Sequence, residues 1–154
     1  MLYNLTKETI TQYFGDATYH CIPPTLRKYK LYVISGFDLK NKKINICTYA
    51  LIPDEKIQTY TKLFEILKNS YKFNPKIFSM DFCRSSSKAL KKIFPNCIIV
   101  KCFFHWVKAL WPNMKKFGFT DKNNISITKT VLFNIKVLAF IEPKLIKKYY
   151  SSTK

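Results

Sequence analysis

Alternating apolar and polar positions in the first third of the chain predict three β-strands. The first covers residues 10–21, and Pro23-Pro24 ends it because proline cannot donate to a strand ladder. Leu31–Phe37 and Ile44–Leu51 form the next two, which read as a hairpin around the polar turn at residues 38–43.

Apolar residues at helical spacing alternate with short apolar runs farther along. Pro53-Asp54 starts a helix, with Asp54 as its expected N-cap. The helix carries an apolar stripe at helical intervals, made of Ile57, Tyr60, Leu63, Phe64 and Leu67. Lys76–Phe82 and Cys97–Phe104 are predicted strands, and Ser85–Phe94 is the helix between them.

The last third of the chain is predicted to be helical. Apolar residues recur at helical intervals over residues 106–117, where Pro112 is expected to kink or end the helix. A further helix covers Ser126–Phe140, and Pro143 is expected to open a basic tail.

This order of elements, β-β-β-α-β-α-β-α-α, predicts an α/β fold. A meander followed by two βα units gives a mixed five-stranded sheet with helices on its faces. We expect a core over residues 1–105, followed over 106–154 by the start of a helical region and the basic tail.

Composition favours a folded chain with a polyanionic partner. Apolar residues make up 47% of the 154 residues and aromatic residues 16%, which is ample for a core and excludes intrinsic disorder. The formal charge of +18 favours nucleic acid as the partner. Coding bias is the alternative origin of this charge, because all basic residues except Arg27 and Arg84 are Lys and the chain is rich in residues that A/T-rich codons specify.

No targeting signal changes this interpretation. No run approaches the roughly 18 apolar residues of a membrane span, and residues 1–13 lack an apolar signal core. We therefore expect no membrane association and no secretion. The five cysteines are then expected to be reduced thiols inside the cell.

Asp16 and Asp81 are the candidate metal ligands. Each follows a short apolar run of the predicted sheet, in a chain with nine acidic residues against 27 basic ones. Carboxylates there are costly to desolvate unless they are paired or bind metal. If their strands are neighbours, about 4.8 Å apart, both carboxylates could bind one hard cation such as Mg²⁺. Two such ions support phosphodiester cleavage or strand transfer.

A structural role is the alternative for both aspartates. Asp16 would cap a turn at Gly15, and Asp81 would cap the helix that begins near Ser85. Spacing alone leaves both interpretations open.

Cys102 and His105 form half of a zinc-type pattern. Structural zinc requires four ligands. Cys97 lies five residues before Cys102 and would point to the opposite face of a strand, and His20 is the one other histidine. A packing role for Cys102 is therefore favoured over a complete zinc site.

The chain resembles the catalytic domain of Mutator-like element (MULE) transposases over residues 12–145. Residues 14–19, Phe-Gly-Asp-Ala-Thr-Tyr, are similar to the Asp-Gly-Thr-Phe opening of that family. Further similar segments follow in the family's order, at residues 31–37, 49–53, 59–67, 81–82, 89–90, 94–96, 102–105, 109–111 and 138–140.

The resemblance implies a ribonuclease-H-like fold and a DDE-type, metal-dependent, cut-and-paste DNA transposase. Asp16 and Asp81 match the family's first two acidic ligands, and Cys102 and His105 match its CxxH signature. The implied cofactor is Mg²⁺ or Mn²⁺, and the implied partner is DNA, with a second copy or a full-length transposase as a further partner. The implied location is the nucleus.

The third acid of the family's triad has no match. It is a glutamate that follows a helical insertion after the fifth strand, and Asp121 and Glu142, the acidic residues after His105, lie in no matching context. Cys83 and Pro112 also depart from the family pattern. We expect a carboxy-terminally truncated, inactive remnant that can still bind DNA through phosphate contacts. The alternatives are an active transposase or nuclease core, and a non-catalytic, basic nucleic-acid-binding module derived from a transposase.

Overall fold

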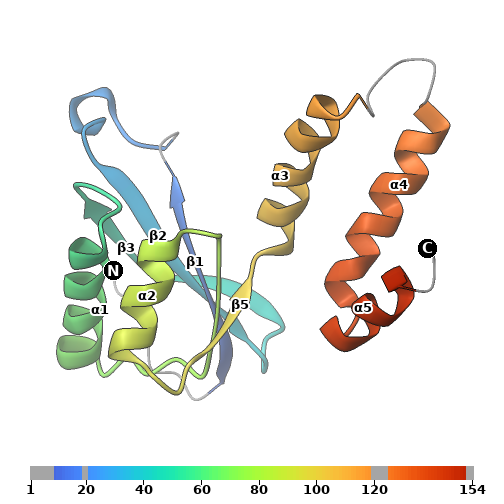
Figure 1. The fold of residues 1–154 in the computed structure, drawn as a ribbon. Helices are drawn as coiled ribbons and strands as arrows, with labels where there is room; N and C mark the ends of the chain where they lie inside the picture. Colours follow the sequence, from blue (N-terminus) through green and yellow to red (C-terminus); the bar gives the residue numbers. More distant parts are fainter. Residues whose placement is uncertain (1–8, 19–20, 119–124, 152–154) are drawn as a thin grey trace. The chain divides into compact units, whose positions relative to one another are not determined.

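The computed structural model describes residues 9–18, 21–118 and 125–151 (Figure 1). Its elements in chain order are β1 (Ile10–Thr18), η1 (Pro24–Leu26), β2 (Lys30–Asp38), β3 (Lys43–Ile52), α1 (Ile57–Tyr71), β4 (Ile77–Met80), α2 (Arg84–Ile93), β5 (Ile98–Lys101), α3 (Phe103–Lys116), α4 (Ile125–Val137), η3 (Leu138–Phe140) and α5 (Pro143–Ser151).

The five strands form one mixed sheet in the order β3-β2-β1-β4-β5. β1 pairs antiparallel with β2, and β2 with β3, whereas β1 pairs parallel with β4, and β4 with β5. The crossover from β4 to β5 runs through α2. The predicted mixed five-stranded α/β architecture is thereby confirmed, and it is consistent with a ribonuclease-H-like fold that further helices follow.

The chain divides into two compact units, Met1–Cys102 and Phe103–Lys154. The first contains the sheet with α1 and α2, and the second contains α3, α4, η3 and α5. Within the second unit, the rings of Phe103 and Phe140 lie 5.0 Å apart, centroid to centroid, which joins α3 to η3. The predicted boundary after residue 105 stays a prediction. Across the described ranges, no helix combines the length and apolar character needed to cross a membrane.

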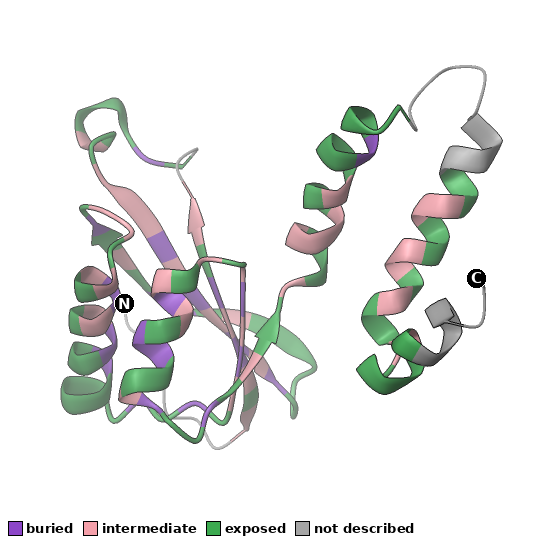
Figure 2. Cartoon of the chain, in the orientation of Figure 1, coloured by how far each residue is buried: buried purple, intermediate pink, exposed green. Residues whose placement is uncertain are grey.

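The core of the first unit lies between α1, α2 and one face of the sheet (Figures 1 and 2). The predicted stripe of α1 contributes Tyr60, Phe64 and Leu67, all buried. Phe64 is fully buried and meets the rings of Phe78 and Phe94 edge-on at 6.2 and 6.4 Å. Burying a side chain of this size contributes about 1.5–3 kcal/mol, so this aromatic cluster fixes α1 and α2 on the sheet.

The opposite face of the sheet carries exposed apolar side chains. Strand residues point alternately to the two faces, and this second face includes Ile44, Ile46, Tyr49 and Leu51 of β3 and Ile98 and Val100 of β5, all exposed. The two faces therefore differ: one is packed under helices, and the other presents side chains, among them those of the candidate site.

Three predicted strands are shorter than expected. The strand predicted over residues 10–21 ends at Thr18, and the one over 76–82 is Ile77–Met80. The run at 97–104 is a strand only over Ile98–Lys101, since Phe103 begins α3. Phe103 packs on Trp106, three residues later, at 5.9 Å between ring centroids, a spacing typical of a helix. The continuous apolar run over 97–104 does not show where the strand ends and the helix begins.

The predicted start of α1 and the expected tail after Pro143 also differ from the structure. Asp54 does not cap α1, whose N-cap is Lys56. The Oδ1 atom of Asp54 instead accepts the backbone N–H of Lys56 at 3.0 Å and the hydroxyl of Thr59 at 2.5 Å, which closes the turn before the helix. Pro143, expected to open a basic tail, begins α5, because proline is favoured at a first helical position.

Pro112 does not end α3, which continues through it to Lys116. Proline removes one backbone donor from the turn. The side-chain amide of Asn113 donates to the carbonyl oxygen of Ala109 at 2.9 Å. This bond supplies a donor to the turn that proline weakens.

Gly15 is a packing constraint that can be tested. A Cβ atom on Gly15 would lie 2.4 Å from the hydroxyl oxygen of Tyr32 and 2.6 Å from Cε1 of Phe78, both buried in the core. We expect Gly15→Ala to lower the free energy of unfolding by about 1–3 kcal/mol through overpacking, measured by urea denaturation. Phe78→Leu in the same chain should reduce this cost, and strictly additive effects of the two substitutions would contradict the overpacking.

The buried tyrosines predict a loss of stability in alkali. Burial raises the pKa of Tyr32 and Tyr60, and burial together with Cys47 raises that of Tyr13 from 10.0 to about 12. Because the folded state holds the protonated phenols, their contribution is complete below pH 10.0 and is lost as the pH rises toward 12.

Urea unfolding at a series of pH values across that range measures this loss. Tyr60→Phe should make the fall in stability less steep, whereas Tyr49→Phe, at a side chain that is 56% exposed, should not. Equal pH dependence in Tyr60→Phe and the unmodified chain would refute the assignment.

Candidate metal centre

The parallel pairing of β1 and β4 brings Asp16 and Asp81 together. Gly15 on β1 is the register partner of Met80 on β4. Asp16 and Asp81 are the next residues on these adjacent strands, so the condition for a shared cation site, that the two strands are neighbours, is met. Asp16 lies inside β1, two residues before its end at Thr18, rather than at the strand end, whereas Asp81 directly follows β4.

Both aspartates belong to the sheet face opposite α1 and α2. Gly15 and Met80 are buried on the helix side, and side chains alternate along a strand, so the next residues point the other way. The side-chain amide of Gln12 donates to the hydroxyl of Ser79 at 2.9 Å across this same face. Asp16 is exposed and Asp81 is half-buried, so water and ions can reach both carboxylates.

Backbone hydrogen bonds hold each carboxylate in place. The N–H of Ala17 donates to Oδ1 of Asp16 at 2.9 Å, and the N–H of Cys83 donates to Oδ1 of Asp81 at 3.0 Å. The N-cap of α2 is Cys83, without a side-chain capping bond. Asp81 therefore closes the turn before α2 and does not cap the helix, so the capping alternative is wrong for Asp81.

Lys101 adds a positive charge that sequence reasoning missed. It ends β5 opposite Met80, and its ammonium group donates to the backbone oxygen of Asp81 at 2.9 Å and to the hydroxyl of Ser87 at 2.5 Å. Partial burial lowers the pKa of Lys101, against the opposing effects of Asp81 and Cys83. The signal that could have found Lys101 is its place at the end of the strand beside the Asp81 strand.

Tyr32 lies beneath the aspartates on the helix side of the sheet. Its hydroxyl is 3.4 Å from that of Ser86, in a buried contact. Burial is the main cause of its raised pKa, and Asp81 and Asp16 both add to it. Both carboxylates thus act on one phenol, which agrees with their position on neighbouring strands.

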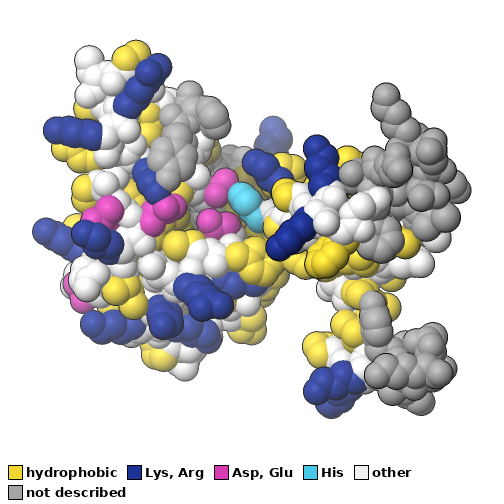
Figure 3. All heavy atoms as spheres, turned by 45° about the horizontal axis from the view of Figure 1, so that its top comes forward, with side chains coloured by type: hydrophobic (Ala, Val, Ile, Leu, Met, Phe, Trp, Pro, Cys, Tyr) yellow, Lys and Arg dark blue, Asp and Glu magenta, His cyan; other side chains and the backbone are white. Residues whose placement is uncertain are grey.

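Acidic side chains gather near one another on the first unit, as the magenta group in Figure 3 shows. Glu55, paired with Lys30, acts with Asp81 on Tyr60, whose pKa is raised mainly by burial. Even so, among the residues with described positions, no three His, Cys, Asp or Glu side chains form a group that could hold a metal ion. Of the two acidic residues considered after His105, Glu142 pairs with Lys144 at 3.5 Å, and Asp121 lies outside the described residues.

The two residues of the CxxH pattern fall in different units. Cys102 follows β5 and closes the first unit, where its N–H donates to the carbonyl oxygen of Met80 at 2.8 Å. His105 lies in the first turn of α3, and its ring meets that of Phe104 edge-on at 5.6 Å. A shared role for the pair stays a prediction, and His20 lies outside the described residues.

Comparison with known protein families gives a match that includes both aspartates of the candidate site. The model of the MULE transposase domain matches residues 14–109, a span that includes both aspartates, Lys101 and the CxxH pattern. No individual curated protein matches the sequence significantly. The similarity of residues 138–140 to the family lies beyond the matched span and stays a prediction. Because the match covers more than half of the 154 residues, the chain belongs to the MULE transposase domain family.

Proposed function

We propose that this transposase-derived chain binds a divalent metal ion through Asp16 and Asp81 and serves metal-dependent cleavage and transfer of DNA strands. The observation that carries the proposal is the placement of these two aspartates directly after register partners, on neighbouring parallel strands that are not consecutive in the chain. A cation would offset the repulsion between two carboxylates on adjacent strands, in a chain with nine acidic and 27 basic residues.

The donor set fits Mg²⁺ or Mn²⁺. Mg²⁺ is usually held by one or two protein carboxylates, with water and substrate phosphates as its other ligands. Each aspartate has one oxygen held by a backbone N–H, which orients the group before any ion binds. When bound, such an ion supplies activation of the attacking oxygen and stabilisation of the leaving oxygen in phosphodiester chemistry.

The other residues of the site act on position and charge. The ammonium group of Lys101 holds the backbone at Asp81 through its carbonyl oxygen, and its positive charge favours approach of a DNA phosphate. Tyr32 and Ser86 pack beneath β1 and keep the strands in register. None of these three residues needs to exchange a proton for the proposed reaction.

A binding module without chemistry is the second candidate. The absence of a third metal-binding side chain beside Asp16 and Asp81, among the residues whose positions are known, favours this candidate. In that case the chain is an inactive remnant or a domesticated module that binds DNA through its basic surface. The nuclear location, and self-association or association with a full-length transposase, remain parts of the proposal that follow from the family.

Cleavage of DNA is the direct test. An active site predicts that the chain nicks duplex DNA with Mg²⁺ or Mn²⁺, and that Asp16→Asn or Asp81→Asn lowers the rate at least about 100-fold, the upper range for loss of a group that only supports a metal ligand. Glu65→Gln, which removes one exposed negative charge from α1, is the matched control and should cleave normally. Nicking that survives both aspartate substitutions would reject the active site.

Metal binding, measured by the melting temperature and compared with nicking, separates an inactive remnant from an active core. We expect Mn²⁺ to raise the melting temperature of the unmodified chain, since an ion at 100 times its dissociation constant stabilises by about 2.7 kcal/mol. The same addition should shift Asp81→Asn far less, and Glu65→Gln as much as the unmodified chain. A shift without nicking supports the remnant, and an equal shift in all three proteins excludes Asp81 as a ligand.

A further inference from the structure

One side of α2 carries only basic residues at its exposed positions. Arg84, Lys88, Lys91 and Lys92 are spaced as i, i+4, i+7 and i+8, which places them on one side of a helix. All four are exposed, and α2 contains no acidic residue. We call these four residues the α2 basic stripe.

The opposite side of α2 is fixed in the core, so the stripe is held outward. Ser86, Ala89 and Leu90 are buried against the sheet. The hydroxyl of Ser87 donates to the carbonyl oxygen of Cys83 at 2.9 Å and accepts a hydrogen bond from Lys101. These contacts hold the first turn of α2 beside Asp81.

The stripe is electrostatically unfavourable for the helix itself. Like charges four residues apart cost a few tenths of a kcal/mol per pair, and a cation such as Arg84 in a first turn opposes the helix dipole. Within the described ranges, no acidic side chain forms an ion pair with the stripe. Lys91 donates to the carbonyl oxygen of Pro95 at 3.2 Å, which uses one of its three donors. A polyanion would relieve this repulsion.

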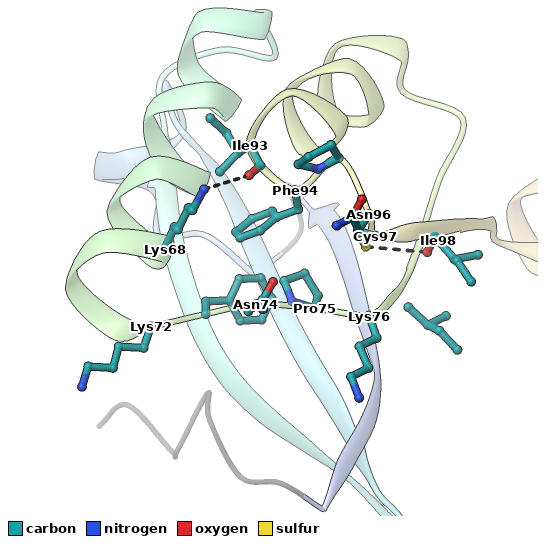
Figure 4. Close-up of a pocket in the computed structure, with 13 residues that line it drawn as sticks. Lys68, Lys72, Asn74, Pro75, Lys76, Ile93, Phe94, Asn96, Cys97 and Ile98 are labelled. Carbon is teal, nitrogen blue, oxygen red and sulfur yellow. Dashed lines mark hydrogen bonds between the residues drawn. The ribbon is translucent and has the colours of Figure 1, made fainter.

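Basic character continues past the end of α2. A pocket of about 980 Å³ lies between the ends of α1 and α2 and the starts of β4 and β5 (Figure 4). Lys68, Lys72 and Lys76 line it, and none of its lining residues is acidic. Lys68 donates to the carbonyl oxygen of Ile93 at 3.2 Å, which joins this pocket to the last turn of α2. Figure 3 shows Lys and Arg side chains grouped on the same face of the first unit as the acidic group, below it.

We propose that the α2 basic stripe binds the phosphate backbone of a DNA strand that extends from the Asp16–Asp81 site. The stripe begins three residues after Asp81, and its length from Arg84 to Lys92 is about 12 Å at 1.5 Å per residue. One strand of DNA carries a phosphate about every 3.4 Å along the axis, so the stripe spans three to four phosphates. The choice of DNA rests on the proposed function, whereas the location of the contact rests on α2.

The salt dependence of DNA binding tests the stripe. The association constant of the full chain for a short DNA duplex is measured by fluorescence anisotropy over a range of salt concentrations, without divalent metal. The slope of log K against log salt should fall in magnitude by about 0.9 per lost phosphate contact, thus by about 2.7 when Lys88, Lys91 and Lys92 are all replaced by Gln. Arg84→Gln alone should lower it by about 0.9.

Two lysines of the turn between β2 and β3, together with Lys43 at the start of β3, provide a matched control. Replacing Lys40, Lys42 and Lys43 by Gln removes the same charge at exposed positions away from α2, and the slope should stay unchanged. An equal fall in both triple variants, or an unchanged slope in the stripe variant, overturns the proposal. Unfolding midpoints of the variants confirm that they fold, and Arg84→Gln gives a second test should the triple variant be unstable.

These experiments can reject the proposed DNA contact and the proposed cleavage activity independently of each other. Asp16→Asn should lose nicking while keeping the full salt slope, because it leaves the stripe intact. A normal stripe effect without nicking leaves the DNA contact and removes the catalytic proposal. Absence of salt-dependent DNA binding by the unmodified chain overturns the stripe, whatever the outcome of the metal experiments.

Discussion

The parallel ladder between β1 and β4 joins two parts of the chain that a hairpin and α1 separate in the sequence. Gly15 permits this ladder, because the ring of Phe78 and the hydroxyl of Tyr32 occupy the space that a Cβ would need. The aromatic core under α1 packs against the same ring of Phe78. Tight packing there fixes the register, and the register places Asp16 beside Asp81, so the candidate site depends on contacts made on the opposite side of the sheet.

The local charge at this edge of the sheet is negative, opposite in sign to the net charge of the chain. The formal charge is +18, yet acidic residues gather near the ends of β1 and β4. Backbone N–H groups bind Asp16 and Asp81, and Lys101 binds the main chain at Asp81 rather than its carboxylate. The carboxylates are thereby oriented by the fold, and a cation remains the natural way to lower their mutual repulsion.

Sequence patterns predicted the mixed five-stranded sheet and the order of its elements along the chain, because alternation and βα connections restrict the topology of a sheet. They left the neighbouring of the two aspartate strands as a condition, which the pairing of β1 with β4 meets. They could not predict Lys101 or Tyr32 as neighbours of the site, since those contacts arise from pairing between distant strands. Errors at element ends had local causes: an apolar run concealed the start of α3 at Phe103, and hydrogen bonds of Asp54 moved the start of α1. The family resemblance supplied what pattern alone left open, the choice between capping and metal binding as a hypothesis for Asp81.

Two residues, Phe82 and Cys83, separate Asp81 from the first residue of α2. A helix is stiff, and α2 is anchored by its buried side to the same core that fixes β4. A strand of DNA bound along α2 would therefore be held at a fixed distance from Asp81. The length of the helix would then determine which phosphate lies at Asp81. That choice would depend on the number of nucleotides bound along α2 and not on their base sequence.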